Sequence, residues 1–205
     1  MVASCEWVDV GSGLKGYYGK PDGAGPHPCL VVYIEAFGVN DHFKKLTQRL
    51  ADEGFATITP DIYGGDTYSY EDLGNAIGKL KTMNDDIVMQ QTEQCLDWLS
   101  DQSEADEKRS GVMGFCMGGR FTFLANAQLA GKFKGASSFY GGGIGPIEDG
   151  AGRKVLLDRV AEMGAPILFW YGSDDDSIQP DELGRIAQSM AEHKKQYTMT
   201  CFPNV

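Results

Sequence analysis

The sequence predicts an α/β protein with a mostly parallel β-sheet that carries helices on both faces. Short, continuous apolar runs alternate with amphipathic helical segments along most of the 205 residues, as is typical of strands buried on both sides. A glycine-rich turn at residues 114–119 joins one apolar run to a helical segment. Most of the chemically suggestive side chains directly follow apolar runs, which is where ligands lie in such sheets.

The first half of the chain is expected to open with an antiparallel hairpin and to continue with buried strands and helices. Gly11-Ser12-Gly13 separates the two strands of the hairpin. Asn84 is a suitable N-cap for a long helix, and the acidic residues that follow it suit the positive end of the helix dipole. The expected strands are 6–10, 14–18, 30–34 and 55–59, and the expected helices are 41–53 and 84–100.

The second half of the chain repeats the alternation of strand and helix. Residues 110–113 form a short apolar run into the glycine-rich turn, and residues 120–129 leave the turn as a helix with a broad apolar face. No repeat, low-complexity segment or linker is visible, so a single domain over residues 1–205 is expected. The remaining expected elements are the strands 135–140, 166–171 and 197–202 and the helix 180–194.

Composition and charge argue against several classes of partner. The formal net charge is −11 at pH 7 and no basic stripe is present, so neither nucleic acid nor an acidic membrane is expected as a partner. The N-terminal residues lack the regions of a signal peptide, and no apolar run reaches membrane-spanning length. The five cysteines are scattered without a zinc-binding pattern, so we expect reduced thiols, no metal, no cofactor and a cytoplasmic location.

The segment Gly114-Phe115-Cys116-Met117-Gly118-Gly119 has the spacing of a nucleophile elbow, with a thiol in place of the usual hydroxyl. Small residues two positions before and after the nucleophile let the backbone turn sharply between a strand and a helix. The positive end of the helix dipole would favour the reactive thiolate. The alternative is a buried structural cysteine in a glycine-rich turn. Other polar groups at the same predicted sheet edge favour the nucleophile.

Four segments together resemble the dienelactone hydrolase family, the carboxymethylenebutenolidases of the α/β-hydrolase fold. They are Glu35-Ala36-Phe37-Gly38-Val39-Asn40, Pro60-Asp61-Ile62-Tyr63, Gly114-Phe115-Cys116-Met117-Gly118-Gly119, and the stretch from Gly172 to Ile178. They occur in the order that the family has. The resemblance implies the α/β-hydrolase fold and cysteine-dependent hydrolysis of a small-molecule ester or lactone through a thioester acyl-enzyme.

The resemblance also implies a Cys–His–Asp triad with an auxiliary glutamate. Cys116 matches the nucleophile and Asp175 matches the triad acid, whose acidic neighbours on either side are interpreted as solvated. Glu35 matches the glutamate that is thought to hold or deprotonate the thiol. In this fold the oxyanion is bound by two backbone N–H groups, which correspond here to those of Ala36 and Met117.

The candidate substrate-binding residues are Phe37, Tyr63, Tyr140 and Arg120, together with the loop 64–70. Family members that use dienelactone supply arginines to bind its carboxylate. Residues 64–83 contain no arginine, and a lysine lacks the bidentate fork of arginine. This departure argues against dienelactone as the substrate rather than against ester hydrolysis.

None of the three histidines, His27, His42 and His193, matches the position of the triad histidine. In the family that residue follows the last strand, whereas this sequence stops at Val205 shortly after the strand 197–202. We therefore expect the domain to be truncated, and the natural protein to continue past Val205 with a histidine within about five residues, the length of a short loop. The intact mass of the natural protein would test this expectation.

Two other functions remain open at this point. One is a binding protein that keeps the α/β-hydrolase fold without catalysis, because the triad histidine is missing. The other is a thiol enzyme of the glutamine-amidotransferase type, which also uses a cysteine elbow but leaves Glu35 and Asp175 unexplained. Thiol-sensitive turnover of p-nitrophenyl acetate would distinguish the hydrolase from the binding protein.

Overall fold

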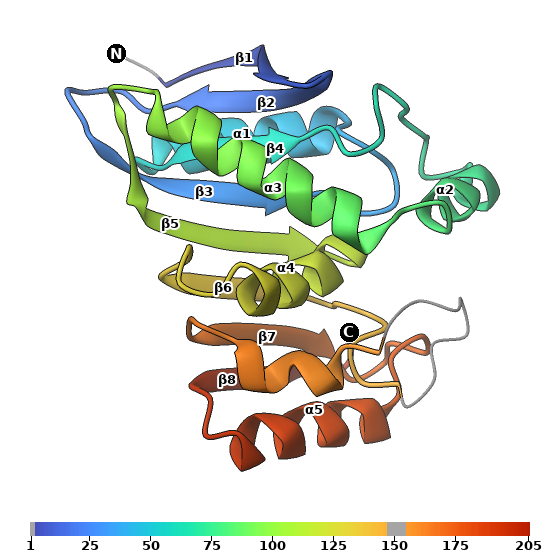
Figure 1. Cartoon of the computed structure of the whole chain (residues 1–205). Coiled ribbons are helices and arrows are strands. Elements are labelled where there is room, and N and C mark those ends of the chain that lie inside the picture. The colour runs from blue at the N-terminus through green and yellow to red at the C-terminus, as the bar shows by residue number, and fades with distance from the viewer. Residues whose placement is uncertain (1–2, 147–154) are drawn as a thin grey trace. The chain divides into compact units, whose positions relative to one another are not determined.

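Two compact units make up the structure, a computed structural model that describes residues 3–146 and 155–205. The first unit is Met1–Gly111 and the second is Val112–Val205. Each unit contains its own strands and helices (Figure 1). Within the described residues, no helix is both long enough and apolar enough to cross a membrane.

The sheet of the first unit is made of strands β1 (Ser4–Gly11), β2 (Leu14–Lys20), β3 (His27–Tyr33), β4 (Ala56–Pro60) and β5 (Ala105–Phe115), the last of which continues into the second unit. The strand order is β1-β2-β4-β3-β5 (Figure 1). β1 and β2 form the antiparallel hairpin expected from the sequence, and β1 is the edge strand. β2 is also antiparallel to β4, whereas β3 and β4 are parallel.

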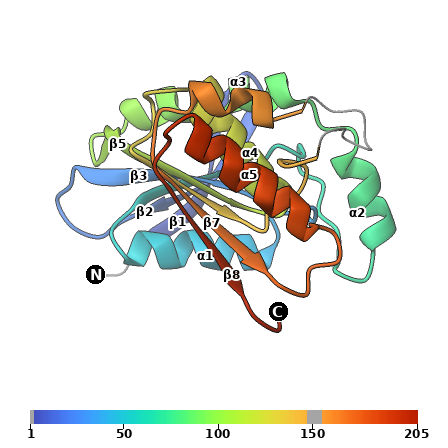
Figure 2. The same cartoon turned by 90° about the horizontal axis from the view of Figure 1, so that it is seen from below.

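The helices of the first unit are α1 (Asp41–Asp52), α2 (Leu73–Leu80) and α3 (Asp85–Ser100). α1 packs against β1, β2 and β4, and α3 packs against β1, β3 and β4. The two helices lie on opposite faces of these strands (Figure 2). As expected, Asn84 caps α3, because its side-chain oxygen accepts hydrogen bonds from the N–H groups of Asp86 and Ile87 at 2.9 and 3.1 Å.

A pair of buried hydroxyl groups joins α1 to the sheet of the first unit. The Oγ1 atoms of Thr47 on α1 and Thr59 on β4 lie 2.8 Å apart, and both residues are fully buried. Thr47 Oγ1 also donates to the carbonyl of Phe43 at 2.8 Å, one turn earlier in the helix. Thr59 is therefore the donor to Thr47. Through this bond neither of the two buried hydroxyl groups is left without a hydrogen-bond partner.

The second unit continues from the end of β5 through β6 (Gly135–Phe139), β7 (Ile167–Gly172) and β8 (Tyr197–Phe202), in that order. β6, β7 and β8 are parallel. The described part of this unit also contains the α-helices α4 (Met117–Gln128) and α5 (Pro180–Glu192) and the 3-10 helix η1 (Leu157–Glu162). Every residue of α4 from Met117 to Ala127 is buried, which agrees with the broad apolar face expected for this helix.

One face of the second unit's strands carries a row of stacked aromatic rings, which we call the aromatic row. It consists of Phe115, Phe139, Trp170 and Phe202, one from each strand from β5 to β8. Successive ring centroids are 4.7, 5.9 and 6.1 Å apart, and the rings are within 20° of parallel. The parallel register places Phe139 directly beside Trp170, so the row follows from the pairing of the strands.

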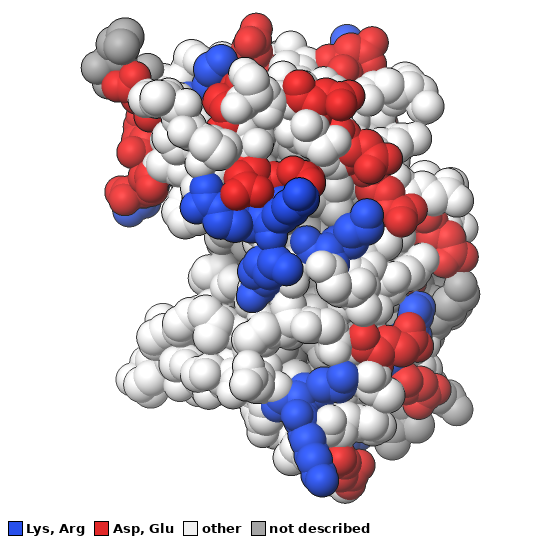
Figure 3. All heavy atoms as spheres, turned by 60° about the vertical axis from the view of Figure 1, so that its left-hand side comes forward, with Lys and Arg blue, Asp and Glu red and all other residues white. Residues whose placement is uncertain are grey.

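Charged side chains cover much of the surface. Acidic groups are spread over the face shown in Figure 3, and basic groups gather there in small clusters with acidic groups beside them. Partly exposed ion pairs include Lys20–Glu104 at 3.2 Å and Arg159–Glu162 at 2.6 Å. Pairs of this kind contribute little to stability, on the order of 0–1 kcal/mol each.

Most expected elements are present within a few residues of their predicted ends, and β8 has the predicted bounds. The sequence did not predict α2, η1 or the first half of β5. α2 contains Gly74 and Gly78 and has no side-chain cap, so its local signal is weak. β5 begins with charged residues that resemble a loop, but these use hydrogen bonds outside the strand, for example from Arg109 Nη2 to the carbonyl of Pro26 at 2.6 Å.

The threonine pair gives a test of the packing of α1. Thr47→Val should lower the free energy of unfolding by about 1–3 kcal/mol, because it leaves the buried Thr59 hydroxyl without its acceptor. Thr59→Val should cost less, about 0.5–1.5 kcal/mol, because the Thr47 hydroxyl keeps its bond to the Phe43 carbonyl. The double variant should lose less than the sum, because no unpaired hydroxyl remains. Urea unfolding measures all three. Thr92→Val combined with Thr59→Val is the control and should be additive; an additive Thr47/Thr59 pair would contradict the analysis.

Candidate active site

Cys116 lies on a sharp turn between the end of β5 and the start of α4. Its backbone has φ 54° and ψ −118°, a conformation that is costly for a residue with a side chain, by about 1–3 kcal/mol. The turn closes through hydrogen bonds from the Cys116 N–H to the Phe139 carbonyl at 3.0 Å and from the Gly119 N–H to the Cys116 carbonyl at 2.9 Å. This is the strand–turn–helix geometry of a nucleophile elbow.

Two glycines make this turn possible by allowing close backbone contacts. A Cβ on Gly114 would lie 2.3 Å from the carbonyl oxygen of Gly118. A Cβ on Gly119 would lie 2.7 Å from the carbonyl oxygen of Phe139. Neither contact can be relieved by moving a flexible side chain, because the other atom belongs to the backbone. The glycines that the sequence marked on both sides of Cys116 are therefore required by the turn itself.

The thiol of Cys116 is half-buried at the N-terminus of α4. Met117 is the first residue of that helix, where backbone N–H groups point away from the helix body and can bind an anion. The arrangement can therefore hold negative charge at the thiol and next to it.

Three of the other four thiols are protected by their surroundings. Burial raises the pKa of Cys5 and Cys29 to about 11, and nearby acidic groups add to the effect. Burial raises the pKa of Cys95 to about 12. These thiols are therefore protonated at neutral pH and react slowly, since the thiolate is the nucleophile. Cys201 is exposed on β8.

Asp175 follows β7 in the loop that leads to α5. Its Oδ1 atom accepts hydrogen bonds from the backbone N–H and the hydroxyl of Ser177 at 2.8 and 2.5 Å, which fix the carboxylate in place. Asp175 is partly buried, whereas Asp174 and Asp176 are exposed. The structure thus distinguishes Asp175 from the two acidic residues beside it.

A hollow of about 500 Å³ lies beside Asp175 in the second unit. Tyr140 lines it as well, with a positive φ of 37° and 39% of its surface exposed. The walls are otherwise apolar and include part of the aromatic row. The remaining lining residues are Phe139, Trp170, Tyr171, Gly172, Phe202 and Val205. The structure therefore brings together Tyr140 and Asp175, two of the residues singled out from the sequence.

Glu35 lies in the first unit, two residues after β3 ends. One of its carboxylate oxygens accepts a hydrogen bond from the Tyr70 hydroxyl at 2.8 Å. Burial and this carboxylate both raise the pKa of Tyr70, so the phenol stays protonated and continues to donate. The ring of Tyr70 also contacts that of Phe37, with 4.6 Å between centroids. Ala36, whose N–H is an oxyanion candidate, lies between Glu35 and Phe37 in the sequence and is almost fully buried.

Tyr70 is a residue whose role the sequence did not reveal. It lies in the loop 64–70, which the sequence suggested only as a pocket wall. Its partner Glu35 is 35 positions away, so no local spacing connects them. Two backbone features draw the loops together: the Tyr68 N–H donates to the Phe37 carbonyl at 3.1 Å, and Gly38 leaves no room for a Cβ beside Asp66.

Tyr63 and Lys79 brace the same loop. Tyr63 is buried, and the Lys79 ammonium lies 5.5 Å from the centre of its ring. Lys79 also forms an ion pair with Asp66 at 2.6 Å. Both contacts of the Lys79 ammonium described here are thus with residues of the same chain, Asp66 and Tyr63. Tyr63 contributes to the support of the loop rather than to its exposed surface.

The remaining candidates lie in different surroundings. Arg120 is fully buried in α4, so its guanidinium is part of the interior. His27 begins β3, and His42 lies in the first turn of α1. His193 caps the C-terminus of α5, with Nδ1 2.9 Å from the Ser189 carbonyl. Among the described residues, no group of three or more His, Cys, Asp or Glu side chains could hold a metal ion.

Comparison with known proteins identifies the family. The model of the dienelactone hydrolase family matches residues 14–205. A protein of Yersinia pestis named "Putative carboxymethylenebutenolidase" is 29% identical over 203 residues, which cover 94% of this chain and 73% of that protein. A crystal structure titled "Putative Dienelactone Hydrolase" from Klebsiella pneumoniae is 27% identical with a TM-score of 0.91, and the match covers all of this chain and 87% of that one.

A dienelactone hydrolase-like promiscuous phosphotriesterase from metagenomic libraries shares the fold, with a TM-score of 0.82, 24% identity and coverage of 100% of this chain and 83% of that one. The mostly parallel sheet with helices that the sequence predicted, in the α/β-hydrolase arrangement, is confirmed by these likenesses. The chain belongs to the dienelactone hydrolase family and is a hydrolase of carboxylic esters or lactones.

Proposed function

We propose that this hydrolase cleaves a small ester or lactone with Cys116 as its nucleophile, through a thioester acyl-enzyme. The observation that carries the proposal is the backbone of Cys116, which is held in a costly conformation at the N-terminus of α4 by close contacts of two glycines. Strain of this kind is retained where the surrounding structure enforces it, and it is concentrated at functional sites.

In the proposed reaction the Cys116 thiolate attacks the carbonyl carbon of the substrate. The carbonyl oxygen becomes an oxyanion, which the backbone N–H groups of Met117 and Ala36 would bind. Collapse of this intermediate breaks the bond to the alcohol oxygen, which leaves with the proton that was taken from the thiol, and the acyl group remains on Cys116 as the thioester. Water then hydrolyses the thioester, which releases the acid and restores the thiol.

Glu35 and Asp175 have separate roles in this proposal. Glu35 would accept the thiol proton as substrate arrives, and the Tyr70 hydroxyl would hold its carboxylate in place through the 2.8 Å hydrogen bond. Asp175 would orient the triad histidine that the family resemblance implies and that would activate water, and the two donors of Ser177 fix the Asp175 carboxylate. We also propose, as expected from the sequence, that residues 1–205 belong to a single domain.

The substrate is proposed to be a neutral ester or lactone. Phe37 and Tyr140 offer aromatic surface, and Tyr140 lines an apolar hollow, whereas Tyr63 is buried and would act only by supporting the loop. The side chain of Arg120 is fully buried, and Lys79 is engaged by Asp66 and Tyr63. A substrate carboxylate such as that of dienelactone would therefore find less cationic support than the family's arginines supply.

The reactivity of the thiols tests the assignment of Cys116. Brief treatment with substoichiometric iodoacetamide at pH 7 should label Cys116 first. Labelling of Cys5 should rise about tenfold per pH unit from pH 7 to 9, because its pKa of about 11 keeps the thiolate fraction small. Peptide mapping by mass spectrometry measures both. Preferential labelling of Cys201 would contradict the assignment.

Activity provides the second half of this test. Cys116→Ala should lower kcat/KM for p-nitrophenyl acetate by roughly 1,000-fold or more, as expected when a nucleophile is removed. Cys201→Ala, at the exposed cysteine, is the matched control and should retain activity. If the intact protein shows no turnover, the binding-protein alternative is favoured.

The hydrogen bond from Tyr70 to Glu35 can be tested by removing a single oxygen. Tyr70→Phe keeps the ring against Phe37 and should lower kcat/KM by roughly tenfold, the value of one charge-assisted hydrogen bond. In a Glu35→Gln background the same change should have little further effect, since the carboxylate that it positions is gone. Steady-state kinetics measure both. Tyr68→Phe in the same loop is the control; equal losses in both backgrounds would rule out a role through Glu35.

A further inference from the structure

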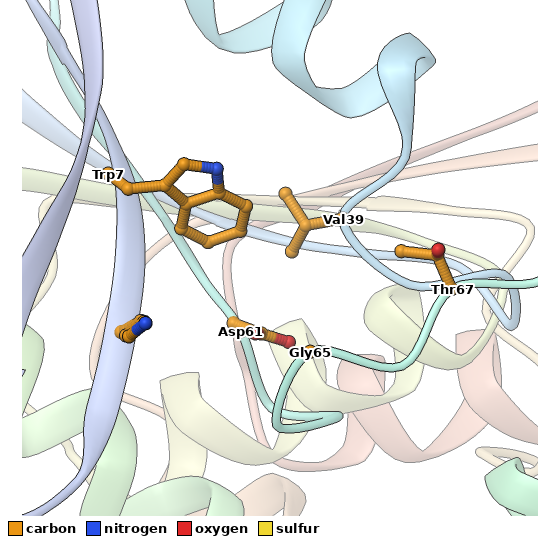
Figure 4. A pocket seen from close by; sticks show the side chains of 6 residues that line it. Trp7, Val39, Asp61, Gly65 and Thr67 are labelled. Atoms are coloured by element: carbon orange, nitrogen blue, oxygen red, sulfur yellow. The ribbon is translucent and has the colours of Figure 1, made fainter.

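A small hollow in the first unit lies apart from the residues assigned to hydrolysis. Its volume is about 280 Å³, slightly below the range of roughly 300–1,000 Å³ that is typical of ligand pockets, so an occupant has to be small. Gly65 and Thr67 belong to the loop 64–70, but none of the lining residues has a catalytic role in the proposed reaction. They are Trp7, Lys15, Val39, Asp61, Gly65 and Thr67 (Figure 4).

The strand register explains why three of these side chains meet. Directly paired residues of antiparallel strands share a face of the sheet. Trp7 is paired with Tyr17, two residues from Lys15, and Gly16 is paired with Pro60, the residue before Asp61. The Asp61 N–H donates to the Lys15 carbonyl at 2.9 Å, which extends this pairing by one residue. Trp7, Lys15 and Asp61 therefore project from the same face.

The carboxylate of Asp61 is the unusual group in this hollow. The residue is only 7% exposed, and backbone N–H groups of the following loop, those of Tyr63, Gly64 and Gly65, hydrogen bond to it. Even so, its Oδ1 atom is buried and has no hydrogen-bond partner among the described residues. Burial raises the pKa of Asp61, which reflects the cost of keeping this charge out of water. A positive charge from a molecule bound beside the carboxylate would offset that cost.

The two other sides of the hollow restrict the chemistry of that molecule. Lys15 brings a positive charge on an exposed side chain, so a simple amine that approaches Asp61 would be repelled by Lys15. A simple carboxylate that approaches Lys15 would be repelled by Asp61. Trp7 and Val39 offer apolar surface, and an edge-to-face contact with Tyr17 at 5.4 Å supports the Trp7 indole. An occupant with one charge of each sign and an apolar body satisfies all of these groups.

We propose that this hollow binds a small zwitterion, an α-amino acid with an apolar side chain. Its ammonium group pairs with the Asp61 carboxylate, its own carboxylate pairs with the Lys15 ammonium, and its side chain packs against Trp7 and Val39. The proposal does not depend on the hydrolase mechanism, because it concerns binding by other residues.

Isothermal titration calorimetry on the whole chain tests this site. L-leucine and L-phenylalanine are the probes, at concentrations up to the millimolar range. The two leucine analogues that each lack one charge, isoamylamine and isocaproate, should bind at least roughly tenfold more weakly than L-leucine. Asp61→Asn and Lys15→Met should each weaken binding of L-leucine by roughly tenfold or more. The matched controls are Asp97→Asn, on α3, and Lys45→Met, on α1, and both should bind as the unaltered protein does.

A second measurement keeps the proposal testable if Asp61→Asn does not fold. The indole N–H signal of Trp7 in an NMR spectrum, assigned by its loss in Trp7→Phe, should shift on titration with L-leucine, whereas those of Trp98 and Trp170 should not. The proposal is wrong if neither amino acid binds, if a singly charged analogue binds as tightly, or if the Trp7 signal stays unchanged.

Discussion

The absence of a side chain at Gly114 and Gly119 is the constraint on which the candidate site depends. It allows β5, α4 and β6 to approach through backbone atoms: Cys116 N–H bonds to the Phe139 carbonyl, and Ser138 Oγ donates to the Gly119 carbonyl at 3.0 Å. These contacts fix the start of α4, and the burial of nearly the whole helix keeps it there. The geometry of the turn at Cys116 therefore depends on three elements and is not confined to one loop.

In the first unit, contacts between loops hold the polar groups in place. The loop after β3 and the loop after β4 are joined by the Tyr70–Glu35 hydrogen bond and by the backbone bond from Tyr68 to Phe37. Lys79 completes this brace through Asp66 and the ring of Tyr63. Asp61 begins the second of these loops, so one short segment serves both the proposed hydrolase residue Glu35 and the hollow that we assign to a zwitterion.

The sequence predicts those features that depend on neighbouring residues. The turn at Cys116 follows from glycine spacing, the N-cap of α3 from Asn84, and the strand ends from apolar runs. It does not predict features that depend on distant partners, such as the hydrogen bond of Tyr70 to Glu35 or the unpaired oxygen of Asp61. The helix α2 was missed for another reason, because two glycines weaken its pattern. The roles of Cys116, Asp175 and Glu35 came from family resemblance and remain predictions for experiment.

The aromatic row has a consequence for the behaviour of the protein in solution. The row reaches β8, the last strand in the order of the described sheet. Its member Phe202 is 47% exposed, and Leu168 on β7 is 41% exposed. An edge strand beside exposed apolar surface invites association between copies, whereas a net charge of −11 keeps copies apart. Salt screens that repulsion, with a Debye length of about 30 Å at 0.01 M and about 8 Å at 0.15 M. Colloidal stability should therefore decline as ionic strength rises, even while the fold itself is unaffected.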